Sequence, residues 1–123
     1  MEIDVLGVKL ELDVDLTDAA GAEQWEATVN ELLQSLKEVE SGKGFKQSEV
    51  IRGEIDATKQ WLDSTFGAGA GAKVFEGRDN LKTVYIVQNL MRTLHVVYIP
   101  KILNDAWLDA LKQYSPERAK RKK

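Results

Sequence analysis

The chain has 123 residues, of which 43% are hydrophobic and 30% charged, and its formal net charge is −3. This length fits one domain, and this apolar fraction is enough for a hydrophobic core. The sequence has no cysteine, which excludes disulfides, thiolate metal sites and cysteine nucleophiles. Its longest apolar stretches, such as Val96–Ile99, are far shorter than the ~20 residues of a membrane span. Because the N-terminus also has no basic start and no apolar signal region, we expect a cytoplasmic protein without a membrane partner.

Acidic and basic residues are separated along the chain. Residues 1–40 hold eleven acidic residues and two basic ones, whereas residues 117–123 hold five basic residues and one acidic one. We expect a single domain over residues 1–116, followed by a disordered basic tail over residues 117–123. The tail either makes an electrostatic contact or is a solvated terminus that only aids solubility. The candidate interaction residues of the tail are Arg118, Lys120, Arg121, Lys122 and Lys123.

The N-terminal segment, about residues 2–15, alternates apolar and charged residues, a pattern typical of strands with one solvated face. Gly7 interrupts the alternation, which predicts a β-hairpin with its turn at this residue. A lone hairpin is marginal in water, so it must pack on helices or pair with another chain. The apolar residues Val8, Leu10 and Leu12 are therefore candidate interaction residues as well.

Helical spacing begins directly after the hairpin. Apolar residues recur every three or four positions from Ala22 to Val39, which predicts an amphipathic helix of about six turns. Thr17 is a candidate N-cap, and the glycines at 42 and 44 are expected to end the helix. A second helix is predicted to begin at about Phe45 or Ser48 and to end at Phe66, where Gly67 supplies the C-terminal glycine.

The glycine- and alanine-rich segment from Gly67 to Lys73 resembles a phosphate-binding loop only superficially. A P-loop has Ser or Thr after its lysine and follows a strand, whereas here Val74 follows Lys73 and the segment follows a helix. We therefore expect no nucleotide site. The segment is interpreted as a flexible turn between helices.

The segment from Leu81 to Tyr114 carries conflicting signals. Residues 83–87 and 95–99 are rich in β-branched and aromatic side chains, which favours strands. Its length and its lack of turn residues before Ile99 favour a central helix. Pro100 is expected to kink or stop that helix, because proline lacks the N–H donor. A last helix is predicted over about 101–114. The predicted fold is thus mainly α (α+β), a short N-terminal β-hairpin packed on a bundle of about four helices.

No combination of residues indicates catalysis. His95 is the single histidine and lies among apolar residues, which favours a neutral, hydrogen-bonded histidine in the core or an interface over a catalytic base. The acidic residues Asp13, Asp15 and Asp18 lack the glycine and the closing glutamate of a calcium loop. We expect no catalytic residue, no cofactor and no metal site. The three tryptophans are expected in the core.

Two stretches resemble a family of small tail proteins, grouped with tail assembly chaperones, from siphophages and prophages of Gram-positive bacteria. The first comprises Phe66-Gly67, then Lys73-Val74-Phe75-Glu76-Gly77, then Asn80-Leu81. The second is Tyr114-Ser115-Pro116-Glu117-Arg118-Ala119-Lys120-Arg121, in which Glu117 and Lys120 stand where the family has amide residues. The resemblance implies a protein that binds the tape-measure or major tail protein in the bacterial host cytoplasm during assembly and keeps it soluble.

The resulting hypothesis is a non-enzymatic tail assembly protein with other tail proteins as partners, and homo-oligomerisation is open. One alternative is a structural tail or neck subunit that stays in the virion, with its strands pairing between neighbours. Another is a small regulatory or nucleic-acid-binding protein that uses the basic tail. Nucleic-acid binding is disfavoured, because the body is acidic and the basic cluster has no interleaved aromatic residues.

Overall fold

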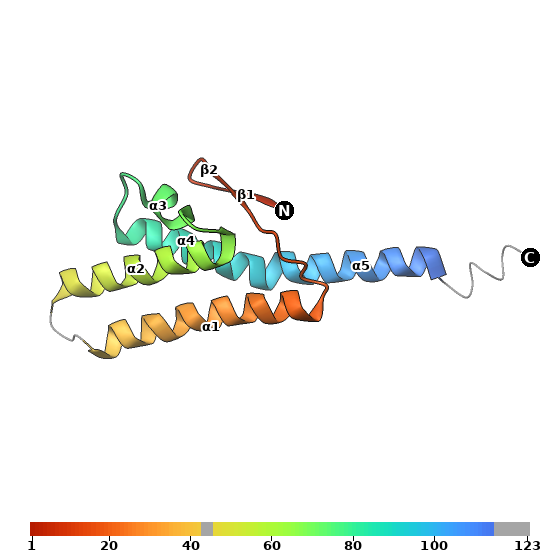
Figure 1. Ribbon diagram of the computed structural model, residues 1–123, viewed down its shortest axis with the longest axis horizontal. Helices are drawn as coiled ribbons and strands as arrows, with labels where there is room; N and C mark the ends of the chain where they lie inside the picture. Colours follow the sequence, from red (N-terminus) through yellow and green to blue (C-terminus); the bar gives the residue numbers. More distant parts are fainter. Residues whose placement is uncertain (43–45, 115–123) are drawn as a thin grey trace, which may run out of the picture.

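The computed structural model describes residues 1–42 and 46–114 (Figure 1). In chain order the elements are β1 (Glu2–Val5), β2 (Val8–Glu11), α1 (Ala19–Gly42), α2 (Gln47–Phe66), α3 (Ala70–Phe75), α4 (Leu81–Thr93), the π-helical turn η1 (Leu94–Tyr98) and α5 (Ile99–Tyr114). The helices α1, α2 and α4 lie side by side, with α3 and the hairpin over one side of α2 and α4 (Figure 1). The predicted hairpin on a helical bundle is confirmed.

The hairpin is antiparallel and pairs Ile3 with Leu10 and Val5 with Val8. Its two turn residues, Leu6 and Gly7, both have positive φ, 53° and 83°. This is the backbone of the tight turn whose twist matches that of paired strands. The predicted turn at Gly7 is confirmed, although the strands end at Glu11. Val5 and Leu10 are buried against the helices, which explains how so small a sheet is held.

A turn at Asp15 leads the chain into α1. The Asp15 carboxylate accepts hydrogen bonds from the Thr17 hydroxyl at 2.6 Å and from its backbone N–H at 2.9 Å. These bonds lower the pKa of Asp15. Thr17 therefore lies in the preceding turn and is not the N-cap, and α1 begins two residues later. Gly21 is required in the first turn of α1, because a Cβ there would overlap the Asp15 carbonyl.

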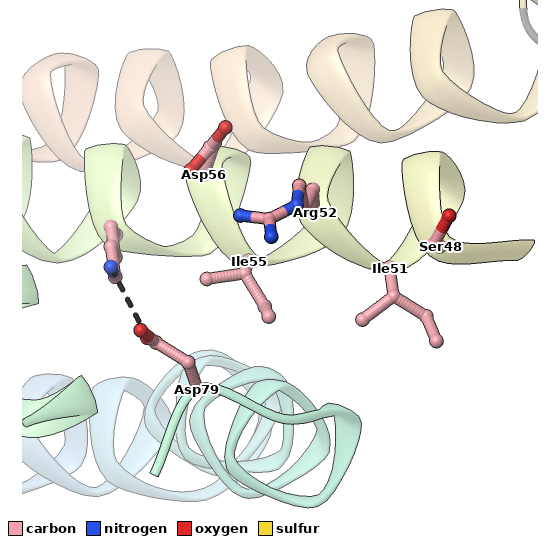
Figure 2. Close-up of a pocket in the computed structure, with 7 residues that line it drawn as sticks. Ser48, Ile51, Arg52, Ile55, Asp56 and Asp79 are labelled. Carbon is pink, nitrogen blue, oxygen red and sulfur yellow. Dashed lines mark ion pairs between the residues drawn. The ribbon is translucent and has the colours of Figure 1, made fainter. Parts of the chain in front are cut away.

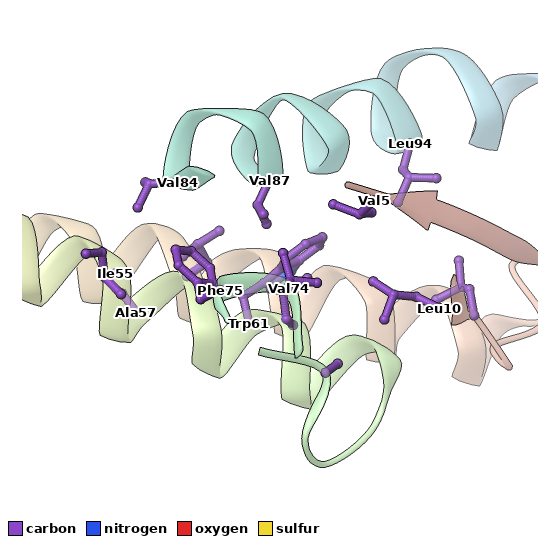
Figure 3. Close-up of a cluster of buried hydrophobic side chains, with 14 of the residues drawn as sticks. Val5, Leu10, Ile55, Ala57, Trp61, Val74, Phe75, Val84, Val87 and Leu94 are labelled. Carbon is purple, nitrogen blue, oxygen red and sulfur yellow. The ribbon is translucent and has the colours of Figure 1, made fainter. Parts of the chain in front are cut away.

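The helices α1 and α2 pack closely at Gly53, where a Cβ would come within 2.8 Å of the Val39 side chain. Aromatic rings fill the other end of this contact. Trp25 and Trp61 meet edge to face with centroids 6.2 Å apart, and Trp61 meets Phe66 in the same way at 5.8 Å. The core continues from these rings to α3, α4 and the hairpin (Figure 3). Two of the three tryptophans are thus core residues, as predicted.

The glycine-rich segment is a packed element and not a flexible turn, so that interpretation was wrong. Gly67 ends α2 with φ 108°, Gly69 precedes α3 with φ 90°, and Ala70 and Gly71 are buried. A Cβ on Gly71 would lie 2.6 Å from the Lys59 carbonyl oxygen. Gly71 also donates its N–H to the Asp63 carboxylate at 2.8 Å. The small residues are there because α3 lies directly on the backbone of α2.

The helix that begins at Leu81 does not stop at Pro100. It passes through η1 into α5 and runs on in one direction for about 50 Å (Figure 1). Within η1 the hydrogen bonds reach five residues back, as from the Ile99 N–H to the Leu94 carbonyl. This wider turn lets the backbone relax around the proline, which an α-helix accommodates poorly. The helix was expected to kink or stop at Pro100. It instead continues through a π-helical turn just before the proline. None of the described helices is long and apolar enough to cross a membrane.

Candidate protein interface

Helix α5 projects beyond the other helices and has no described partner over most of its length (Figure 1). Ile99 and Ile102 pack against the core at its start. From Leu103 to Gln113 every side chain is exposed. Several of these side chains are large and apolar, with Trp107 60% exposed, Leu103 47% and Leu111 40%. Apolar patches of this kind on a soluble protein usually mark an interaction surface.

The exposed apolar residues of α5 form a stripe. Leu103, Trp107 and Leu111 are four residues apart, so they lie above one another on one helix face. The small residues Ala106 and Ala110 lie beside them on the same face, which lets another helix approach closely. We call these five residues the α5 stripe. The opposite face carries Lys101, Asp105, Asp109 and Lys112, together with Leu108. The helix is amphipathic, although its residues from Leu103 to Gln113 are exposed.

A groove between α1 and the α4–η1 helix lies next to the base of α5. Its volume is about 510 Å³, and it is lined by Glu26, Val29, Asn30, Leu33, Met91, Arg92, His95 and Val96. Leu33 is 50% exposed and Val96 60%, so the groove presents apolar surface to solvent. On its inner side, α2 packs against both α1 and α4. The groove thus lies between two helices, α1 and α4, that both pack on α2.

One polar contact joins α1 to η1 at the edge of the groove. The Trp25 indole N–H donates to Nδ1 of His95 at 3.1 Å. The ring planes are inclined by 16°. His95 is hydrogen-bonded as predicted, but it lies on the exposed rim of the groove and not in the core.

A second hollow, of about 350 Å³, lies between α2 and the residues before α4 (Figure 2). Its charges balance, because Arg52 and Lys59 face Asp56 and Asp79. Lys59 and Asp79 form an ion pair at 3.2 Å, and the Lys59 ammonium lies 5.6 Å from the Phe75 ring centroid. This hollow therefore favours neither an anion nor a cation. Within residues 1–42 and 46–114, no group of metal-ligating side chains comes together.

Of the predicted interaction residues, only those of the hairpin lie within the described part of the chain. Leu10 and Leu12 are buried in the core, at 5% and 3% exposure, because the hairpin turns its apolar face onto the helices. They are not available to a partner while the hairpin stays closed, so the expected interface there is corrected. Val8 is half-buried beside them. The tail residues Arg118, Lys120, Arg121, Lys122 and Lys123 lie outside the described residues, as does the predicted end of the domain at 116.

Sequence reasoning missed the α5 stripe. Trp107 was expected in the core together with Trp25 and Trp61, but it is the most exposed of the three. All three tryptophans lie on the apolar side of an amphipathic helix, so their local patterns are equivalent. The one available signal was Pro100, which predicted a helix boundary near the start of α5. That signal does not show whether α5 folds back onto the bundle or runs away from it.

The profile of one protein family, described as "Family of unknown function (DUF6673)", matches residues 7–123. The chain belongs to this family. No curated protein and no solved structure matches it. The match spans β2, every helix and the C-terminal residues, so it includes both the groove and the α5 stripe.

In this member of the DUF6673 family, the first stretch that resembles tail proteins has a structural role. Val74 and Phe75 are fully buried beneath α4, at 0% and 1% exposure. Gly67 and Gly77 have positive φ at the two ends of α3. Asn80 caps α4, with its side chain accepting the Thr83 N–H at 3.0 Å. These residues stabilise the connection from α2 through α3 to α4. They do not belong to the α5 stripe or to the groove.

Proposed function

We propose that this protein is a non-enzymatic, protein-binding component of phage or prophage tail assembly. The observation that supports it best is α5, an amphipathic helix whose apolar stripe is open to solvent. Amphipathic helices with apolar anchors three and four residues apart are a common way to engage a groove or helix of another protein. The large aromatic anchor, Trp107, is typical of residues that contribute most to such binding.

The tail-assembly context comes from the two stretches that resemble tail assembly chaperones. In that context the partner is the tape-measure or major tail protein, held soluble before it polymerises. A long apolar or coiled-coil segment of such a partner has the surface chemistry that the α5 stripe would cover. The proposal places the protein in the host cytoplasm during assembly.

Co-expression with the tape-measure protein and the major tail protein of the same genome, followed by affinity capture, tests this function. We expect the wild-type chain to capture one of them and Trp107→Lys to lose it. Tyr85→Lys is the matched control, because Tyr85 is 56% exposed but lies on α4, away from the stripe. No complex with either protein, at concentrations where all are soluble, would argue against the function.

A structural tail or neck subunit is the second candidate. It is favoured by the two-stranded sheet, which leaves strand edges open to pairing with a neighbouring subunit. Mass spectrometry of purified virions separates the two candidates, because a chaperone is absent from the particle and a subunit is present in many copies. Nucleic-acid binding through the basic tail is the third candidate. It predicts binding that weakens steeply with salt and is lost without residues 117–123.

A further inference from the structure

We propose that the groove between α1 and the α4–η1 helix and the α5 stripe are two halves of one extended site, and that this site takes a single amphipathic α-helix of the tail-protein partner. The assignment rests on the proposed function, because it names the form in which the partner binds. It adds the groove to the surface already assigned to the partner and fixes how the two halves lie relative to each other.

The groove and the α5 stripe lie on the same side of the helix that bears both. Leu94 is buried and Ile102 packs against the core, so these residues mark the side that faces the body. His95, which lines the groove, follows Leu94 by one position. Leu103, which begins the stripe, likewise follows Ile102. Since each residue of a helix turns it by about 100°, both are displaced from the core side in the same direction, and Trp107 continues the row one turn later.

The π-helical turn η1 produces this alignment. In an uninterrupted α-helix the residue on the core side after Leu94 would be Tyr98, but Tyr98 is 44% exposed. Ile99 packs against the core in its place, and its N–H bonds to the Leu94 carbonyl five residues back. The extra residue turns α5 by about 100° relative to an uninterrupted α-helix of the same sequence. Without it, Trp107 would point away from the groove side.

The walls of the extended site are helices, which decides the form of the occupant. A partner strand binds by hydrogen bonds to a free sheet edge, whereas the main-chain groups inside α1, α4 and α5 are paired within each helix. These helices therefore offer side chains to a partner. Leu33 and Val96 expose apolar surface in the groove, and Ala106 and Ala110 allow a close approach on α5. An amphipathic helix lying lengthwise buries such surface along one face.

Length and charge further define this partner helix. From Met91 to Leu111 the extended site runs for about 30 Å, which corresponds to about 20 residues of helix. The two walls of the groove carry opposite charges, Glu26 on α1 and Arg92 on α4. A complementary helix has a basic residue on the side that faces α1 and an acidic residue on the side that faces α4, with its apolar stripe between them.

An insertion in α5 tests whether the two halves act together. One alanine inserted between Asn104 and Asp105 turns Trp107 by about 100° off the groove side. The insertion lies beyond Ile102, which packs against the core, so the contacts of the body are kept. Four inserted alanines are the matched control, because they add about one turn and bring Trp107 back to the same side. Circular dichroism checks that each chain keeps its helices.

The affinity of each full chain for the tail protein that it captures, the tape-measure or the major tail protein of the same genome, is measured by isothermal titration calorimetry. We expect one alanine to weaken binding by roughly tenfold or more, and four alanines to weaken it by about threefold or less. Wild-type affinity in the one-alanine chain would show that the partner follows the stripe alone, and the inference would be wrong.

A pair of neighbouring valines tests the groove half. Val96 lines the groove and is 60% exposed, whereas Val97 is 55% exposed but does not line it. Val96→Lys should weaken binding by roughly tenfold, and Val97→Lys should leave it unchanged. Equal affinities of the two variants would remove the groove from the site and overturn the inference.

The same measurements separate the inference from the proposed function. A wild-type chain that binds neither tail protein would refute the function and the extended site with it. A wild-type chain that binds one of them, but tolerates both the one-alanine insertion and Val96→Lys, would refute the extended site alone.

Discussion

Helix α2, in the body of the molecule, and the projecting helix α5 are both amphipathic. They differ in whether other parts of the chain cover their apolar face. In α2 the apolar face is buried, with Trp61 at 2% and Leu62 at 0% exposure. In α5 the equivalent face holds Trp107 at 60%. Both helices are amphipathic, so amphipathicity alone does not place a helix in a core. The difference supports the proposal that the apolar face of α5 contacts another molecule.

The largest expected effect is the loss of folding stability when a core side chain, rather than a side chain of α5, is truncated. Phe75→Ala empties a fully buried site under α4 and should lower the free energy of unfolding by about 3–5 kcal/mol. Trp107→Ala, a truncation of similar size in α5, should change it by less than about 0.5 kcal/mol when measured in dilute, monomeric protein. Urea denaturation followed by circular dichroism measures both values. Equal losses would mean that α5 is packed against its own chain.

The contact at the edge of the groove should show an intermediate effect. His95→Ala removes the acceptor of the Trp25 indole N–H, whose side chain is otherwise buried. Leaving this donor without a partner should cost about 1–3 kcal/mol. A double-mutant cycle with Trp25→Phe isolates the hydrogen bond, because phenylalanine has no N–H to satisfy. No coupling between the two substitutions would show that the bond contributes nothing to stability.

Gly71→Ala tests how closely α3 lies on α2. Helix propensity alone predicts that alanine stabilises a helical position by about 1 kcal/mol over glycine. The added Cβ would instead meet the Lys59 backbone at 2.6 Å. We expect a net loss of about 1–3 kcal/mol from overpacking, seen as a lower thermal midpoint. A gain in stability would show that α3 can move away from α2 without cost.

The smallest effect concerns pH. Because burial and Glu40 raise the pKa of Glu54, the folded protein holds a proton at pH values where the unfolded chain has lost it. Stability from this group is present at low pH and is lost as pH rises through the raised pKa. Glu54→Gln should therefore stabilise the protein at neutral pH, by about 0.5 kcal/mol or less after solvent screening. Thermal unfolding of both proteins at pH 4 and pH 7 checks this: the gain should appear only at the higher pH.

The sequence by itself determined the hairpin and the two long helices that follow it. Strict alternation around Gly7 and repeated spacing from Ala22 to Val39 reflect local geometry, because side chains two apart in a strand and three or four apart in a helix share a face. The length of the run from Leu81 favoured a helix over residues 83–99 but left a strand open, and the structure has a helix there. The buried Val74 and Phe75 lie within the first stretch that resembles tail proteins.

Only the tertiary structure decided which apolar faces find a partner within the chain. Gly71 fits because the α2 backbone lies next to it, and Pro100 is tolerated because η1 widens the helix before it. The residues next to Gly71 and Pro100 in the sequence predict neither of these conditions. Burial depends on contacts between elements far apart in sequence. Trp61 and Trp107 both lie on the apolar side of an amphipathic helix, yet Trp61 is in the core and Trp107 is exposed to solvent. That distinction, which the sequence could not make, locates the surface through which this protein is proposed to act.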